Sequence, residues 1–204
     1  LHLIASKIQI TALNQDISLS VRSGIDGDRI PAPVHFSLQG KQENNGMLNL
    51  TAKTNESGVL FSLSSVQKAE IGGKQTEITA RTQAESGMKI YTETAAAVAK
   101  GETFSLTKLS NVFTTRDKGA DSLSQEELQA RSLEHLQAVR ERTFQSIAEE
   151  SEKEWKERIW DTRDILIDSN REEDQLAIRF AIYHLTIMTP SHDNRMNIGA
   201  KGFS

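Results

Sequence analysis

The sequence contains no cysteine among its 204 residues. That absence excludes disulfide bonds, catalysis by a thiol and metal sites with cysteine ligands. It also fits a reducing compartment, and we expect a cytoplasmic protein. The chain has no apolar run that approaches the roughly 20 residues of a membrane-spanning helix. It also has no basic segment leading into an apolar stretch, as a signal peptide would. We therefore expect no membrane partner.

An excess of positive charge is also missing. Lys and Arg together number 24 against 28 Asp and Glu, which gives a formal net charge of −4. The two signs are interspersed along the chain, so the electrostatic footprint of a nucleic-acid-binding protein is absent. The apolar fraction of 37% and the charged fraction of 25% are ordinary for a globular protein. The length allows one or two domains.

Residues 1–115 alternate between apolar and polar with a period of two. Such alternation gives each strand one buried and one solvent-exposed face, which is typical of antiparallel strands in a sandwich or barrel. Glycine-containing turns at residues 24–27, 44–46 and 56–58 separate the predicted strands. The strands centre on the apolar groups Ile8 and Ile10; Ile17, Leu19 and Val21; Val34, Phe36 and Leu38; Leu48 and Leu50; Val59, Phe61 and Leu63; Ile78 and Ala80; Ile90; and Phe104 and Leu106.

The alternation slips in the last predicted strand. Phe104 and Leu106 stand at even positions, whereas Leu109 and Phe113 stand at odd ones. An extra residue in one strand of a pair shifts the phase in this way. The sequence therefore predicts a β-bulge near Lys108.

From about residue 122 the period changes to that of a helix. Ser124 and Glu127 have the spacing of a capping box. No Gly or Pro stands between Ala120 and Ser169, which favours one long helix or two in succession, with a bend near Ser151. The amphipathic stripe that follows consists of Leu133, Leu136, Val139, Phe144, Ile147, Trp155 and Ile159.

A second helix is predicted closer to the C-terminus. Residues 165–167 form a short apolar, strand-like link, and Ser169 with Glu172 has the spacing of another capping box. The helix runs to about Thr189, and its apolar residues cover a wide face. Such wide coverage indicates a helix that is buried among other helices, whose partners we expect to be missing from this chain.

Several combinations of reactive side chains are too weak to predict a site. His184 and His192 lack the spacing of a helical metal pair, and we interpret His184 as a core histidine. The acidic cluster at residues 172–174 suits the first turn of a helix. Trp155 and Trp160 are five residues apart, so we expect them on different sides of one helix. No metal site is predicted.

The C-terminal segment carries a resemblance to a known family. A helix at residues 179–185, RFAIYHL, precedes a loop at residues 193–204, DNRMNIGAKGFS. This segment resembles the first barrel helix and the following loop of glycoside hydrolase family 65, the maltose, trehalose and kojibiose phosphorylases. In that family a run with a Trp-Asp pair that grips the glucosyl unit normally follows. The resemblance implies that this chain ends before that run.

The resemblance, together with the change of period, predicts an α+β architecture. We expect part of an antiparallel β-sandwich, then linker helices, then the first helix of an (α/α)6 barrel. The corresponding boundaries are 1–118 for the sandwich, 119–163 for the linker and 164–204 for the start of the barrel. Because the chain opens in strand-like residues at Leu1, we expect its N-terminus to lie inside the sandwich domain.

The resemblance also implies a reaction. Such enzymes cleave an α-linked glucose disaccharide with inorganic phosphate and invert the anomeric centre, which gives β-glucose 1-phosphate. The family's acid is a glutamate deep in the barrel, and its phosphate-binding residues also lie later, so no catalytic residue is assigned here. We expect a non-catalytic N-terminal piece of such a phosphorylase. We expect the parent enzyme to form a homodimer and to use phosphate as co-substrate without a cofactor.

Two residues remain candidates for contact with a sugar or phosphate, because they flank the loop that leads toward the missing motif. These are Arg195 and Lys201. In the structural alternative, Arg195 pairs with a carboxylate while Gly199 and Gly202 let the loop turn. Two functional alternatives also stay open: a stand-alone β-sandwich module that binds carbohydrate or a protein, and a helical scaffold protein.

Overall fold

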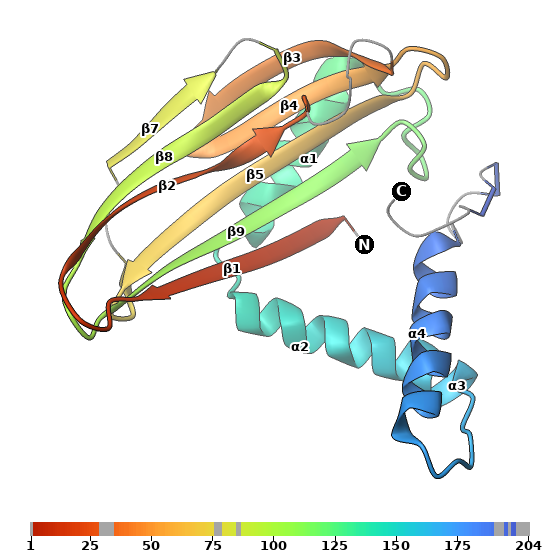
Figure 1. Cartoon of the computed structure of the whole chain (residues 1–204). Helices are drawn as coiled ribbons and strands as arrows, with labels where there is room; N and C mark the ends of the chain where they lie inside the picture. The colour runs from red at the N-terminus through yellow and green to blue at the C-terminus, as the bar shows by residue number, and fades with distance from the viewer. Residues whose placement is uncertain are drawn as a thin grey trace. The chain divides into compact units, whose positions relative to one another are not determined.

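A computed structural model describes residues 2–28, 35–75, 79–84, 87–189, 194–195 and 197–198. The chain divides into two compact units, Leu1–Phe144 and Gln145–Ser204 (Figure 1). Each unit is described by itself below. Val34, Ile78 and His192, which the sequence analysis named, lie outside the described residues. No helix in the described ranges is both long and apolar enough to cross a membrane.

The first unit consists of two antiparallel sheets and one helix. The larger sheet has the strand order β1-β9-β5-β4-β3, with β6 paired to β5, and the smaller sheet has the order β2-β8-β7. This arrangement confirms the predicted antiparallel, sandwich-like architecture. The strands are β1 Leu3–Thr11, β2 Ile17–Asp26, β3 Phe36–Asn44, β4 Met47–Thr54, β5 Leu60–Ile71, β6 Lys74–Gln75, β7 Thr79–Ala84, β8 Lys89–Val98 and β9 Thr103–Thr114.

Two apolar clusters lie between the sheets, as alternation of buried residues requires. One cluster consists of Leu48, Leu50, Ala52, Met88 and Ile90, with Ile25, Phe36, Phe61 and Leu63 packed against it. The other consists of Ala12, Ala69, Val98, Phe104 and Leu106, with Ile10, Ile17, Leu19, Val21, Ile71 and Ala96 packed against it. The sandwich therefore has two cores rather than one.

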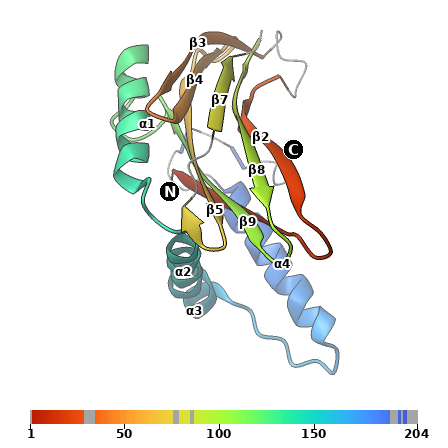
Figure 2. The ribbon, with the colours of Figure 1, turned by 90° about the vertical axis from the view of Figure 1, so that its left-hand side faces the viewer.

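Helix α1, Gln125–Val139, covers the other face of the larger sheet. Figure 2 shows the three layers side by side: α1, then β4, β5 and β9, then β8 and β2. The predicted capping box is confirmed, because Ser124 accepts from the Glu127 amide while Glu127 accepts from the Ser124 amide. The buried residues of α1 are Leu128, Ser132 and Leu136, which share one face.

The predicted bulge near Lys108 is wrong. Strand β9 keeps an unbroken register with both neighbours, β1 and β5. Its phase slips because both of its faces are covered: Phe104 and Leu106 belong to a sandwich core, whereas Phe113 contacts residues of α1. A register shift does occur in β3, between Leu38 and Gly40.

The predicted turn at residues 24–27 is also wrong for its first three residues, since β2 continues to Asp26. Gly24 lies opposite Tyr91 in the strand pair. A Cβ at Gly24 would lie 2.3 Å from the Ile90 carbonyl oxygen and 2.5 Å from the Tyr91 Cβ. This glycine therefore permits a close approach of the two strands and does not mark a turn.

The second unit is helical. Helix α2, Phe144–Trp155, continues through a π-helical turn, Lys156–Trp160, into the short α3, Asp161–Arg163. Helix α4 spans Glu172–Met188, close to the predicted end at Thr189. The predicted bend near Ser151 is wrong, because that residue lies inside α2 and the break from α1 falls at residues 140–143.

The link before α4 is neither a strand nor capped as predicted. Residues 165–167 pair with no strand, and Leu166 is 78% exposed. The N-cap of α4 is Arg171, without a side-chain hydrogen bond to the helix, so the second capping box is wrong. Ser169 instead donates its hydroxyl to Asp174, which removes it from the cap. The residues of α4 include none that is buried.

Candidate functional site

The two residues predicted to contact a sugar or phosphate do not form a described site. Arg195 lies in an exposed turn with Asn194. Lys201 lies outside the described residues. Their role therefore stays a prediction. No group of three or more His, Asp or Glu side chains within the described ranges is placed to hold a metal ion.

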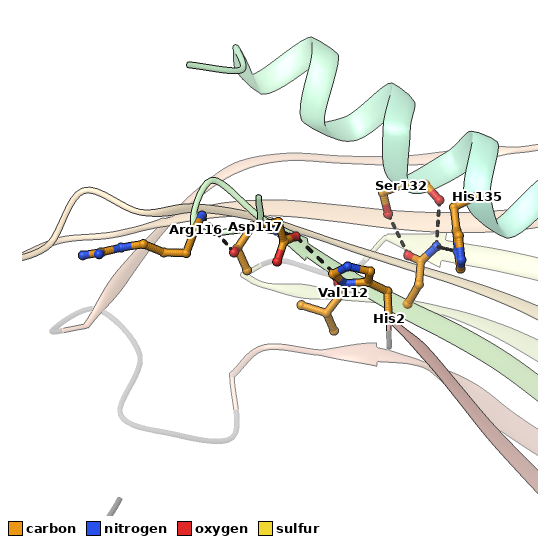
Figure 3. Close-up of polar contacts among 8 residues, drawn as sticks. His2, Val112, Arg116, Asp117, Ser132 and His135 are labelled. Atoms are coloured by element: carbon orange, nitrogen blue, oxygen red, sulfur yellow. Dashed lines mark hydrogen bonds and ion pairs between the residues drawn. The ribbon is translucent and has the colours of Figure 1, made fainter. Parts of the chain in front are cut away.

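A buried polar cluster of the first unit joins α1 to the larger sheet (Figure 3). Its centre is Asn111 of β9, which is fully buried. The Asn111 amide donates to the Ser132 carbonyl at 2.8 Å and to His135 Nδ1 at 3.1 Å. Its side-chain oxygen accepts from the Ser132 hydroxyl at 2.7 Å. Asn111 therefore fixes α1 to the sheet through three hydrogen bonds.

The cluster extends across the sheet to β5 and β4. Ser64 Oγ lies 2.7 Å from Ser132 Oγ, and it is the donor of this pair because Ser132 gives its proton to Asn111. Asn49 donates to the hydroxyls of Ser62 and Ser64, at 2.8 and 2.9 Å. Gln129 of α1 donates to the Asn49 side-chain oxygen at 2.8 Å. Buried polar groups that are satisfied in this way specify one docking geometry.

Two histidines flank the phenyl ring of Phe113 at one end of this cluster. The His2 ring stacks on it with a centroid distance of 4.2 Å, and the His135 ring meets its edge at 5.2 Å. The Arg131 guanidinium lies 5.5 Å from the same ring. His2 donates from Nδ1 to the Val112 carbonyl at 2.8 Å, and Asp117 lies 3.9 Å from that nitrogen (Figure 3).

His135 is held in its neutral form. Its Nδ1 must accept the Asn111 amide proton, which requires the tautomer that is protonated on Nε2. Partial burial, with a smaller contribution from the charge of His2, lowers the pKa of His135 below its ordinary value. A positive charge on this ring would break the hydrogen bond to Asn111. The ring therefore acts as an acceptor within the interface.

The cluster does not form a nucleophile–base pair. A serine nucleophile must give its proton to an adjacent base, whereas Ser132 gives its proton to the oxygen of Asn111. His135 is engaged by Asn111 and not by a serine hydroxyl. What this cluster does is dock a helix onto a sheet.

The second unit contains an aromatic cluster that corrects one prediction. Trp155 and Trp160 stack with a centroid distance of 5.8 Å and an interplanar angle of 25°, so they do not lie on different sides. The π-helical turn between them is the cause: it places residues five apart near each other, where an α-helix would separate them by about 140°. Tyr183 of α4 adds a third ring, 5.1 Å from Trp155.

Ion pairing and an amide group fasten the link to α4. Arg179 donates to Asp164 from Nε at 3.0 Å and from a terminal nitrogen at 2.6 Å. This hydrogen bond lowers the pKa of Asp164 and raises that of Arg179. Gln175 accepts from the Ile167 amide and donates to the Ile165 carbonyl, both at 3.0 Å. The Gln175 side chain thus makes the two backbone hydrogen bonds, to residues 165 and 167, that a neighbouring strand would otherwise make.

His184 is not the core histidine that was predicted. It is half-buried on α4, and its ring contacts those of Phe180 at 4.2 Å and Tyr183 at 5.4 Å. Phe180 is itself 63% exposed. Two acidic residues at the start of α4 are engaged locally: Asp174 accepts from Ser169, and Glu173 lies 3.9 Å from Arg171.

The first unit is thus a sandwich domain with a docked helix, in which the buried polar groups stabilise the structure. Residues 1–158 match the family model for the N-terminal domain of glycosyl hydrolase family 65. The chain therefore belongs to glycosyl hydrolase family 65, as the resemblance of its C-terminal segment predicted.

The relatives of this chain are disaccharide phosphorylases. It is 28% identical to the kojibiose phosphorylase of Halothermothrix orenii and 29% identical to that of Escherichia coli, and in each case the match covers 100% of this chain and 26% of the relative. It is 25% identical to the nigerose phosphorylase of Lachnoclostridium phytofermentans, over 100% of this chain and 28% of the relative. The chain thus spans about a quarter of the length of these relatives.

A solved structure shows the same fold. The chain named "Putative kojibiose phosphorylase from human microbiome" superposes with a TM-score of 0.74 at 13% sequence identity, over 89% of this chain and 22% of that one. At this identity the similarity concerns the fold. It supports the sandwich-like domain.

Proposed function

We propose that this chain is the non-catalytic N-terminal portion of an inverting α-glucoside phosphorylase. The parent enzyme would cleave an α-linked glucose disaccharide with inorganic phosphate to β-glucose 1-phosphate and glucose. The observation that carries the proposal is that relatives named as kojibiose and nigerose phosphorylases match this chain along all of its length. The family match over residues 1–158 supports it.

Two of the described carboxylates, Glu127 and Asp164, do not have the character of a catalytic acid. Inverting cleavage needs a carboxylic acid that protonates the leaving oxygen, and such an acid has a raised pKa. Glu127 and Asp164 show the opposite shift. Hydrogen bonds from Ser124 lower the pKa of Glu127, and a hydrogen bond from Arg179 lowers the pKa of Asp164. Both groups stay ionised and stabilise local structure.

In the parent enzyme the sandwich with its docked α1 would act as a rigid brace for the catalytic domain and contribute to a homodimer. The boundaries 1–118, 119–163 and 164–204 form part of this proposal. So does the cytoplasmic location, with phosphate as co-substrate and without a cofactor. We also propose that Arg195 and Lys201 approach the sugar or phosphate in the complete protein.

The first experiment is an activity assay on the purified chain. Kojibiose, nigerose, maltose and trehalose are each incubated with phosphate, and glucose 1-phosphate is measured. We expect no turnover by the chain, and phosphorolysis of kojibiose by the complete parent protein. Turnover by the chain alone would show that it carries its own catalytic groups. A parent protein that attacks none of the four would contradict the proposed reaction.

The alternative of a stand-alone binding module has its own test. Titration calorimetry of the chain with the same four disaccharides should show no binding heat under our proposal. A dissociation constant in the micromolar to millimolar range for any of them would favour the module instead. Light scattering on the parent protein tests the homodimer.

A further inference from the structure

The two apolar cores of the sandwich are separated by polar side chains on four strands. On β5, Ser65 and Gln67 stand between the apolar residues of the two cores, and on β8 Thr92 and Thr94 do the same. Lys108 of β9 pairs directly with Gln67 across the larger sheet, and Ser23 of β2 pairs with Thr92 across the smaller one. We call this set the polar belt: Ser23, Ser65, Gln67, Thr92, Thr94 and Lys108.

The polar belt contains buried oxygen atoms without a partner from the protein. Within the described residues, the buried side-chain atoms that lack a hydrogen bond are Ser65 Oγ, Gln67 Oε1 and Thr94 Oγ1. All three belong to the belt. Ser65 is 0% and Thr94 is 1% exposed. Native proteins leave few such groups unsatisfied, so three among the six residues of the belt require an explanation.

The long side chains of the belt reach across the sandwich, and the short ones do not. Gln67 Nε2 donates to the Ser23 carbonyl at 2.7 Å, and Lys108 Nζ donates to the Gly24 carbonyl. Packed sheets lie about 10 Å apart, a distance that serine and threonine hydroxyls cannot span. Burial also lowers the pKa of Lys108. The belt is therefore a polar region inside the sandwich with part of its bonding capacity unused.

The donors and acceptors of the belt identify the kind of molecule that satisfies them. Two hydroxyls both donate and accept, the Gln67 oxygen only accepts, and an ammonium group has donors beyond the one used on Gly24. An anion would be repelled by the Gln67 oxygen, which carries a partial negative charge. A cation would be repelled by the Lys108 ammonium group. Water donates and accepts at once, and buried waters typically make about three hydrogen bonds to such groups.

We propose that the polar belt is an internal hydration site, in which ordered water bonds to Ser65 Oγ, Gln67 Oε1 and Thr94 Oγ1 between the two apolar cores. The water joins β5 of the larger sheet to β8 of the smaller one. Together with Gln67 and Lys108 it sets the alignment of the two sheets. Apolar contacts alone are less directional and would set that alignment less sharply.

The first test is the substitution Thr94→Val, which removes the hydroxyl and keeps the shape. If water bonds to Thr94, the water loses a partner and the equilibrium constant for folding falls, by about tenfold. If the belt is dry, removal of an unsatisfied hydroxyl leaves the constant unchanged or raises it. Urea unfolding measures the constant. The control for the preference of strands for valine is Thr107→Val. Thr107 is half-buried and lies on the face of β9 opposite to Lys108.

The second test does not depend on a variant that folds. In the unaltered chain, nuclear Overhauser contacts between water and the amide protons of residues 65–67 and 94 should report long-lived bound water. A high-resolution crystal structure should place a water oxygen within hydrogen-bond distance of the three unpartnered atoms. Absence of water contacts, or hydroxyls that turn to backbone carbonyls instead, would overturn the proposal.

Discussion

The two faces of the larger sheet bury polar side chains in opposite ways. On the face toward α1, Asn49 and Asn111 are fully buried and bonded to side chains and backbone of the helix. On the face toward the smaller sheet, Ser65 is as deeply buried but lacks a protein partner. A helix presents long side chains such as Gln129 to the sheet beneath it, whereas two sheets leave a gap that short hydroxyls do not cross. The kind of covering layer therefore decides how a buried polar group is satisfied.

The largest expected effect comes from disturbing the sandwich face alone. Gly24→Ala places a Cβ 2.3 Å from the Ile90 carbonyl oxygen and 2.4 Å from the Tyr91 Cα. Because backbone atoms must move, we expect a loss of about 3 kcal/mol in the free energy of unfolding. Urea denaturation measures the loss.

Gly40→Ala is the matched control for Gly24→Ala. The nearest atom to its added Cβ is Gln125 Nε2 at 3.6 Å, an ordinary contact. Its effect should stay within about 1 kcal/mol. Equal destabilisation by both variants would show that the close approach of Tyr91 is not the reason why position 24 requires glycine.

The face toward α1 should respond to Asn111→Leu by a smaller amount. The substitution removes three hydrogen bonds and leaves the Ser132 carbonyl buried without that donor. We expect a loss of about 2 kcal/mol. Hydrogen exchange should show the amides of α1 losing protection while those of β2 and β8 keep theirs.

Asn44→Leu, on an exposed strand end, is the control for Asn111→Leu. It should change neither stability nor exchange by a comparable amount, since surface substitutions are usually small in effect. If Asn111→Leu loosened both faces equally, the two faces would not be independent.

The sequence predicts much of the fold through local patterns. Alternation along β5 and β9 predicts strands, and the Ser124 and Glu127 spacing predicts the start of α1, because both signals act between near neighbours. The slip in β9 indicates a bulge when only one face is considered, because alternation does not reveal that a second layer covers the other face. The position of Ser132, midway between Leu128 and Leu136 on the buried stripe, was the available signal for that layer.

Other predictions are wrong because a different local structure forms from the one that the residue spacing indicates. Ser169 has the spacing of a cap, yet its hydroxyl bonds to Asp174. Trp155 and Trp160 lie together because a π-helical turn replaces an α-helical one. The buried polar cluster depends on contacts between residues far apart in the chain, such as Asn111 with His135. No local pattern encodes such contacts, and the candidate site could not be predicted for that reason.

The smallest expected effect is a dependence on pH that is confined to the face toward α1. Partial burial lowers the pKa of His135 in the folded chain, while the unfolded value is about 6.5. Above pH 6.5 both states hold the ring neutral, and stability is fully present. As the pH falls below 6.5 toward the lowered folded pKa, the unfolded state alone gains the proton and stability declines. Below the folded pKa the decline stops.

The variant His135→Gln should flatten this slope. Its side-chain oxygen can accept from Asn111 but does not titrate. The measurement is the urea midpoint at pH 8 and at pH 5.5 for each variant, with His35→Gln, an exposed histidine, as control. His2 and Asp117 stand near the same phenyl ring in every variant, so the difference between His135→Gln and the control isolates His135. A slope that persists in His135→Gln would show that the acid sensitivity does not come from His135. A slope that disappears would show that the neutral tautomer of His135 helps to hold α1 on the sheet.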